Sequence, residues 1–417
     1  MENNKTPSIR FKGFTDPWEQ RKLCDVVKEI TRNDPESEAP IMMITANNGF
    51  IEQSERYAFN NAGESLKKYI LLKKGELAYN HGASKLRPYG SCFALTTAEN
   101  ARIPFVYHCF SAENQNAEFM SIELNGAEIE NQLRKIVSSG ARMDGLLNIS
   151  FDEYTSVSVL LPGIEEQDCI ADFFRQLDHL ITLHQRKYNK LLNVKKSMLE
   201  KMFPKNGSNI PEIRFKGFTD PWEQRKLLSC IEKITDFRGR TPKKLGMDWS
   251  ESGYLALSAL NVKDGYIDFS QDVHYGEQAL YDKWMSGNEL HKGQVLFTTE
   301  APMGNVAQVP DNKRYILSQR TIAFDVKEDI ITENFLAALL RSPAVFNTLT
   351  SLSSGGTAKG VSQKSLAGVD IQIPVELREQ ELLATYFANL DNLITLHQRE
   401  LEKLQNIKKS MLEKMFV

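Results

Sequence analysis

The sequence predicts a mixed α/β protein with two globular bodies, two long helices and an internal pseudo-twofold repeat. Residues 9–23 read IRFKGFTDPWEQRKL, and residues 213–227 are identical at all fifteen positions. A second repeat, LITLHQR followed by KKSMLEKMF, occurs at 180–203 and again at 393–416. The sequence between these repeats shows no comparable match. A constant frame around variable contents is typical of recognition modules on a shared scaffold.

The repeat at the start of each half, here called the frame segment (9–23 and 213–227), mixes Gly, Asp-Pro and aromatic residues. This composition favours an ordered turn followed by a short helix or strand. We expect the aromatic side chains to anchor the segment to the scaffold. They are Phe11, Phe14 and Trp18, with Phe215, Phe218 and Trp222 in the copy.

Two bodies, at about 24–163 and 228–374, lie between the repeats. Short β-like runs at 39–45, 295–299, 315–324 and 369–373 alternate with turns and some helical pattern, which predicts mixed α/β structure. Each body closes on a similar pattern, VSVLLPGIEEQ and VDIQIPVELREQ. A strand that ends at Pro and leads into an acidic segment is typical of a helix start.

The longest stretches without Gly or Pro, at 164–203 and 375–417, are rich in helix-favouring residues. At ~1.5 Å per residue, each unbroken helix would extend roughly 60 Å. Apolar residues recur in steps of three and four, as in a coiled-coil seam. We expect the two helices to pack on one another; the alternative is that each covers only its own body. The seam consists of Leu177, Ile181, His184, Tyr188, Leu191, Met198 and Met202, and of Leu390, Ile394, His397, Leu401, Leu404, Met411 and Met415.

Four seam positions are polar: His184, Lys195, His397 and Lys408. We interpret them as register or partner-facing positions rather than catalysts, because a lone His on such a face is usually structural. The polar stretch PKNGSNIP after the first helix reads as a linker. The predicted division is a first body at 1–163, a helix at 164–203, a linker at 204–211, a second body at 212–374 and a helix at 375–417.

Charge and cysteine content narrow the class of protein. The net charge is -3, and body 24–165 carries 13 Lys and Arg against 19 Asp and Glu. A DNA-binding function therefore requires local basic patches on acidic bodies. The five cysteines form no CxxC pair, which argues against a disulfide framework or zinc site. No run of ~18 apolar residues and no apolar leader occur, so we expect a cytoplasmic protein without a membrane span.

Motifs that would indicate catalysis are missing from the sequence. It contains no G-x-x-x-x-G-K-[ST] loop, no G-x-G-x-x-G after a strand, no G-x-S-x-G and no H-E-x-x-H. No Pro-Pro dipeptide occurs, so the Asn/Asp-Pro-Pro-aromatic motif of amino-methyltransferases is absent. These absences favour a chain that is not itself an enzyme and that binds no metal or cofactor.

Polar and basic loops are the remaining candidates for a binding site. Arg, Asn and Gln are suited to reading base edges, whereas Lys mostly meets phosphate. A solvated surface loop is the alternative for each residue taken singly. The candidates in the first body are Asn80, His81, Ser84, Lys85, Arg87, Tyr89 and Arg142. Those in the second are Arg238, Arg240, Lys243, Lys244, Gln319, Arg320, Thr357, Lys359, Ser362, Gln363 and Lys364.

The frame segment, the EEQ and REQ helix starts and the LITLHQR…KKSMLEKMF helices together resemble the specificity subunit of type I restriction-modification systems. The resemblance covers essentially the whole chain. It implies two target recognition domains that each read half of a split double-stranded DNA site, separated by antiparallel coiled-coil helices. It also implies that the helices bind methyltransferase subunits, of which we expect two, and that these subunits hold S-adenosylmethionine. Restriction subunits would supply the translocation and cleavage of DNA, which depend on ATP and Mg.

Two other functions remain open at this point: a stand-alone nuclease with a built-in DNA recognition region, and a coiled-coil adaptor. If the chain reads a split DNA site, the length of the helices would fix the number of unread base pairs between the two half-sites. A portion of ~27 residues spans about 40 Å, close to one turn of B-DNA. Removing one heptad from both helices should therefore shorten the unread spacer of the DNA site.

Overall fold

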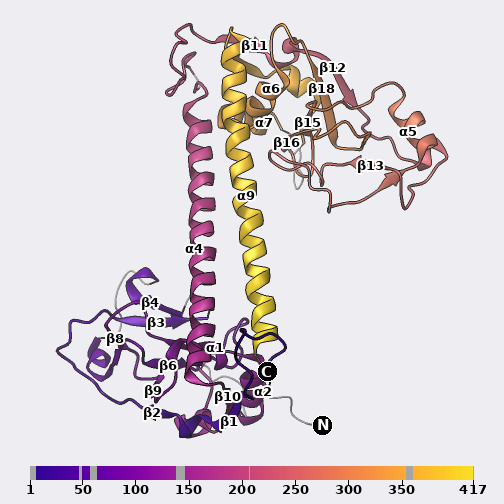
Figure 1. The fold of residues 1–417 in the computed structure, drawn as a ribbon. Helices are drawn as coiled ribbons and strands as arrows, with labels where there is room; N and C mark the ends of the chain where they lie inside the picture. Colours follow the sequence, from indigo (N-terminus) through magenta and orange to yellow (C-terminus); the bar gives the residue numbers. More distant parts are fainter. Residues whose placement is uncertain are drawn as a thin grey trace. The chain divides into compact units, whose positions relative to one another are not determined.

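A computed structural model describes residues 6–46, 49–56, 63–137, 146–205, 207–353 and 360–416. The chain forms two compact units, Met1–His184 with Glu400–Val417, and Gln185–Arg399. Each unit combines one body with part of each long helix. The long helices are α4 (Ile164–Lys201) and α9 (Leu377–Met415), which Figure 1 shows as unbroken rods.

Where the structure describes it, the first unit contains three short α-helices and ten strands. The helices are α1 (Ala117–Glu123), α2 (Ala127–Ile136) and α3 (Phe151–Thr155). The strands are β1 (Glu19–Lys22), β2 (Val27–Glu29), β3 (Met42–Thr45), β4 (Gly49–Glu52), β5 (Ile70–Lys73), β6 (Leu77–Asn80), β7 (Ser91–Ala94), β8 (Asn100–Ile103), β9 (His108–Ala112) and β10 (Ser158–Leu161).

The second unit contains four short helices and nine strands in its described part. The helices are α5 (Gln278–Met285), α6 (Glu333–Leu340), α7 (Pro343–Leu352) and α8 (Gln363–Ala367). The strands are β11 (Glu223–Lys226), β12 (Ile231–Asp236), β13 (Tyr254–Leu257), β14 (Tyr275–Gly276), β15 (Val295–Thr298), β16 (Val306–Gln308), β17 (Ile316–Leu317), β18 (Thr321–Val326) and β19 (Asp370–Ile373).

The frame segment forms the same structure in both units. Its last residues make β1 and β11, which pair antiparallel with β10 and β19, the strands that precede the long helices. Its arginines bind the starts of those helices through paired hydrogen bonds. Arg10 donates to Glu166 at 2.6 and 2.7 Å, and Arg214 donates to Glu379 at 2.7 and 2.8 Å. The repeat predicted from the sequence is therefore a structural frame.

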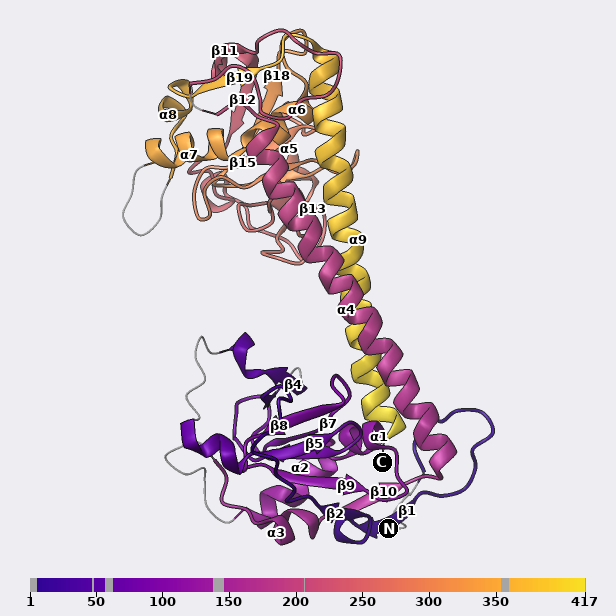
Figure 2. The same ribbon diagram turned by 90° about the vertical axis from the view of Figure 1, so that its left-hand side faces the viewer.

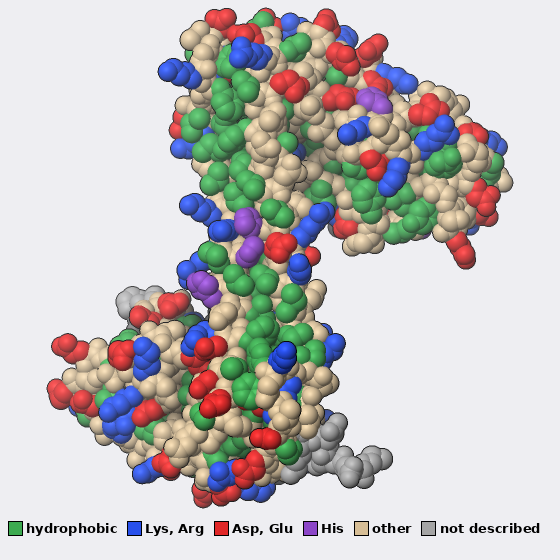
Figure 3. Space-filling model, viewed as in Figure 1, with side chains coloured by type: hydrophobic (Ala, Val, Ile, Leu, Met, Phe, Trp, Pro, Cys, Tyr) green, Lys and Arg blue, Asp and Glu red, His purple; other side chains and the backbone are tan. Residues whose placement is uncertain are grey.

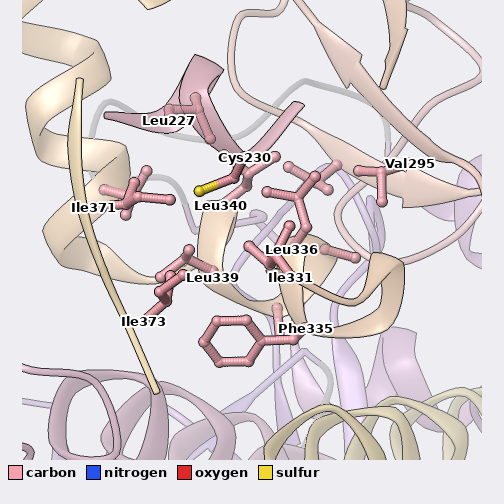
Figure 4. Close-up of a cluster of buried hydrophobic side chains, with 14 of the residues drawn as sticks. Leu227, Cys230, Val295, Ile331, Phe335, Leu336, Leu339, Leu340, Ile371 and Ile373 are labelled. Atoms are coloured by element: carbon pink, nitrogen blue, oxygen red, sulfur yellow. The ribbon is translucent and has the colours of Figure 1, made fainter. Parts of the chain in front are cut away.

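Each unit has a four-stranded antiparallel sheet with the same arrangement. The strand order is β2-β9-β6-β7 in the first unit and β12-β18-β15-β16 in the second. Figure 2 shows β9 and β7 of the first sheet. In the second unit, α6 and β19 contribute to one apolar core, and Leu339 lies beside Ile373 in Figure 4. These buried apolar side chains form the core that supports the frame.

The units differ in what is added to the sheet. The first adds the hairpin β3–β4 and the pair β5–β8, whereas the second adds α5 and β13, which pairs with β14 and, in parallel, with β17. The predicted strand at 315–324 is wrong in one respect, because the structure divides it into β17 and β18. Arg320, between the two strands, has a φ of 66°, which an extended strand does not allow.

The helix segments of each unit run antiparallel. In the first unit, the ring centroids of Phe174 and Phe416 lie 6.1 Å apart, and Asp178 pairs with Lys408 further along. In the second unit, Phe203 lies 5.7 Å from Phe387, and Lys195 pairs with Asp391. The predicted fold class is therefore confirmed: the chain combines mixed α/β bodies with long helices that pair as in a coiled coil.

Candidate nucleic-acid interface

Five loops of the second unit surround a hollow of about 400 Å³. Four of the predicted binding residues line it, and they come from the loop after β12 and from the turn between β17 and β18. Trp249 and His274 form part of the wall with stacked rings 5.6 Å apart. The predicted lining residues are Arg240, Lys243, Gln319 and Arg320.

Hydrogen bonds tie these loops together. The Gln319 amide donates to the carbonyl oxygen of Arg240. The backbone N–H and the hydroxyl of Thr299 both donate to the carbonyl oxygen of Arg320, at 2.8 and 3.2 Å. Val361 N–H in turn donates to the carbonyl oxygen of Thr299 at 2.9 Å. The loops that the sequence singles out separately therefore form one connected surface.

A second group of candidates lies on the same connected set of loops. Arg238 and Gln363 both donate to a carboxylate oxygen of Asp236, each at 3.1 Å. Ser362 caps α8 by accepting from Ser365 N–H at 3.0 Å, which leaves its hydroxyl in a structural role. Thr357 and Lys359, which were also predicted, lie outside the described residues.

The cationic side chains of this surface differ in how far their own chain already uses them. Arg240 donates to the carbonyl oxygen of Trp284 and lies 4.2 Å from the centre of the Phe237 ring. Lys244 donates to the carbonyl oxygen of Gly239 at 2.7 Å. In contrast, three candidates are exposed, and their side chains form no hydrogen bond or ion pair with any described residue: Lys243, Arg320 and Lys364.

The first unit uses two of its predicted base readers internally. The Asn80 side chain donates to the carbonyl oxygen of Ile44 at 3.1 Å and accepts from Gly82 N–H at 2.9 Å. The two ring nitrogens of His81 lie 2.8 and 2.7 Å from carbonyl oxygens of other loops. These side chains hold the loop in place, so they do not present free polar groups to a ligand.

The rest of this loop divides in the same way. The Arg87 guanidinium donates to the carbonyl oxygen of Asn125 at 2.7 Å, and burial lowers its pKa. Tyr89 is half-buried, and its carbonyl oxygen accepts from the Tyr79 hydroxyl. Ser84 and Lys85 are exposed at the loop tip, and Arg142 lies outside the described residues. The described residues of the first unit thus offer fewer free candidates than those of the second.

Sequence reasoning missed four residues that line the hollow of the second unit, Asp248, Trp249, Asp272 and His274, and also Thr299, which holds the carbonyl oxygen of Arg320. They lie in segments far apart in the sequence, and no local motif marks them. In the ranges that the structure describes, no group of three or more His, Cys, Asp or Glu could hold a metal ion. The side chains that line the hollow of the second unit include hydrogen-bonding, cationic and aromatic groups.

The long helices carry a different surface. Of the predicted seam residues, Leu177, Leu390, Ile394 and Leu401 are buried, and Tyr188, Leu191, Met198, Ile181, Leu404 and Met411 are half-buried. Four exposed leucines lie beside them, at matching positions of the two repeats. They are Leu180 and Leu183 on α4, and Leu393 and Leu396 on α9. Figure 3 shows hydrophobic side chains on the surface of both helices.

One pair of helices could be mistaken for a membrane span, and the burial of α6 in the second unit decides the question. Within the described ranges, no single helix is long and apolar enough to cross a membrane, although the bent pair α6–α7 passes by length and composition. Every apolar side chain of α6 is buried in the second unit, as expected for a core helix.

Comparison with known proteins places this architecture. Residues 219–406 match the family described as the type I restriction modification DNA specificity domain. The specificity subunit of the type I restriction enzyme MjaVIII from Methanocaldococcus jannaschii is 26% identical over 289 residues, which cover 66% of this chain and 65% of that protein. The putative MjaX specificity subunit of the same organism is 23% identical over 273 residues, with 64% and 60% covered. The match thus spans less than two thirds of either relative.

A solved structure shares the fold. The crystal structure of the type I restriction-modification system S subunit from M. genitalium aligns with a TM-score of 0.56 at 12% identity and covers 99% of both chains. Residues 219–406 are thus similar in sequence to a type I DNA specificity domain. The whole chain, with its two frames and two bodies, has the fold of that S subunit, and about two thirds of it is similar in sequence to the two specificity subunits from M. jannaschii.

Proposed function

We propose that this chain selects the DNA sequence on which a type I restriction-modification complex acts. Each body reads one half of a bipartite, asymmetric double-stranded site. The observation that carries this proposal is the combination of one repeated frame with two different sets of additions to the sheet. Different loops on equivalent supports favour two unlike half-sites held at a fixed spacing.

The helices scaffold the other subunits in this proposal. Leu180 and Leu183 occupy the same repeat positions as Leu393 and Leu396, and all four are 38–53% exposed. Exposed apolar patches on a folded chain mark interaction sites. Two equivalent patches favour two copies of one partner, which we assign to the methyltransferase subunit. Restriction subunits join the same complex.

The chain itself is non-catalytic and cytoplasmic in this proposal. Its sequence lacks the catalytic motifs of methyltransferases and of P-loop motors. S-adenosylmethionine, ATP and Mg are accordingly assigned to the partner subunits. A stand-alone nuclease would instead cleave DNA without partners, and a coiled-coil adaptor would leave the polar hollow of the second unit without a role.

Methylation mapping tests the proposal directly. DNA from cells that express this chain with its methyltransferase subunit is sequenced for modified bases. We expect one split motif with two unlike halves and a constant unread spacer. Modification at a continuous site, or turnover of DNA by the purified chain alone with Mg²⁺, would contradict the proposal.

A further inference from the structure

Arg320 differs from the other cationic residues that line the hollow of the second unit. Arg320 is exposed and lines the hollow, and its guanidinium makes no hydrogen bond or ion pair with the described residues. We propose that Arg320 reads a guanine in the half-site bound by the second body. This inference rests on the proposed function and adds the residue and base on which the recognition depends.

The backbone holds Arg320 in a defined position. Its φ of 66° lies in the left-handed region, which L residues with long side chains rarely adopt. Two hydrogen bonds from Thr299 fix its carbonyl oxygen, and the neighbouring Gln319 is tied to Arg240. Sparsely populated conformations that the surroundings enforce cluster at functional sites. A side chain that projects from such a rigid turn loses less freedom on binding.

The other free cations suit a different contact. Lys243 and Lys364 are exposed and unpaired among the described residues, but a lysine ammonium is a point charge that mainly meets phosphate. The planar guanidinium of arginine presents two parallel N–H groups, which match the O6 and N7 acceptors of guanine. Arg320 is the arginine of this hollow that has this fork available.

The lining of the hollow favours a base edge over a phosphate. Two carboxylates, Asp248 and Asp272, line it together with Arg320. Asp272 accepts from the Ser258 hydroxyl at 2.6 Å, whereas Asp248 is exposed. Carboxylates repel phosphate but accept hydrogen bonds from the amino group of cytosine. A G·C pair offers acceptors for Arg320 and a donor for a carboxylate in the same groove.

The test uses the assembled complex of this chain with its methyltransferase subunits. The complex methylates a pool of duplexes in which both half-sites are randomised. Arg320→Ala should lower the preference for one G·C pair, in one half-site only, by about tenfold or more. Arg320→Lys should lose most of the same preference, because lysine cannot form the paired contact. Both variants keep an L side chain at this turn, and their melting temperatures verify the fold.

Lys243→Ala is the matched control at the rim of the same hollow. It should weaken binding to all sequences alike and reduce the salt dependence by about one phosphate contact, without changing the preferred sequence. If Arg320→Ala behaves like this control, or leaves every base preference intact, the inference is overturned. Failure of the proposed function looks different, because the wild-type complex would then show no split site at all.

Discussion

Lys195 of α4 lies 2.9 Å from Asp391 of α9, and the counterpart residues Lys408 and Asp178 form the same ion pair in the other unit. The two pairs occupy identical positions of the two helix repeats. Their surroundings differ, however. In the second unit, Arg341 binds Asp391 at 2.8 Å, and Asp264 lies 3.1 Å from Lys195, so that four charges form one network. One repeated contact is thus used in two settings.

This difference predicts unequal effects of equivalent substitutions. The Lys195 side chain is 11% exposed and that of Lys408 is 34% exposed. Lys195→Met should destabilise the protein by about 1–3 kcal/mol, because it removes a hydrogen-bonded charge from a largely buried network. Lys408→Met should cost less than about 1 kcal/mol, as expected for a pair in contact with water. Thermal unfolding of the two variants compares them, and equal losses would show that the network adds nothing.

The sequence marked Lys195 and Lys408 as polar interruptions of an apolar seam, but not their partners. Asp178 and Asp391 become partners only once the antiparallel register of the helices is known. The frame was predictable because fifteen identical residues must form the same local structure twice. Arg10 and Arg214 lie in this frame, and their pairing with Glu166 and Glu379 repeats accordingly.

The candidate binding surface was predictable only in part. The loops with Arg240 and Gln319 were found by composition, and the structure joins them. Asn80 and His81 have the same composition signal, yet their polar groups are used inside the first unit. Residue type does not reveal which backbone carbonyl lies nearby. The left-handed turn at Arg320 also leaves no mark in the sequence, because a non-glycine residue there is held by tertiary contacts.

The first unit binds the C-terminal end of α9 at a site that the equivalent end of α4 from a second copy of the chain could occupy. Phe416 packs against Trp18 and Phe119, with centroids 5.9 and 5.7 Å apart, and Ile9 N–H donates to the carbonyl oxygen of Lys414. Residues 201–203 have the same sequence, Lys-Met-Phe, as residues 414–416. A fragment of residues 1–205 should therefore dimerise by exchanging helix ends.

Sedimentation analysis checks this dimer, with Phe203→Ala as the variant that should return the fragment to a monomer. An exposed substitution elsewhere on the fragment, such as Glu36→Gln, should leave the dimer intact. A wild-type fragment that stays monomeric at high concentration would argue against a shared site.

Glu123 at the end of α1 should make stability depend on pH. Burial raises the pKa of its carboxyl group to about 7, from 4.5, while Leu160 N–H donates to it at 3.1 Å. The fold therefore favours the protonated form. The stability that this preference contributes is fully present below about pH 4.5 and is lost as the pH rises through about 7, a change of roughly 3 kcal/mol.

Glu123→Gln keeps the acceptor for Leu160 and removes the ionisation. The variant should be more stable than the wild type at pH 8 and similar to it at pH 4.5. Chemical denaturation at several pH values measures the difference, with the exposed Glu36→Gln as the control that should follow the wild type. A constant difference across this range would mean that Glu123 is already charged in the fold.

The exposed leucines of the helices should control assembly. Leu183→Glu places a charge on one patch and Leu396→Glu on the equivalent patch, where the side chains are 38% and 53% exposed. Each single variant should reduce the methyltransferase subunits bound per chain by one, and the double variant should bind none. Native mass spectrometry counts the subunits. Leu352→Glu, at an exposed position of α7, is the control, and a similar loss with it would remove the helices from the interface.

The central claim is that the repeated frame carries two independent readers, and an exchange of one body tests it most directly. A hybrid chain keeps both frames and helices but takes residues 228–368 from a type I specificity subunit that recognises a different DNA site. Methylation mapping of cells that express the hybrid should show a new second half-site, with the first half-site and the spacer length unchanged. A change in both half-sites, or in neither, would contradict the account.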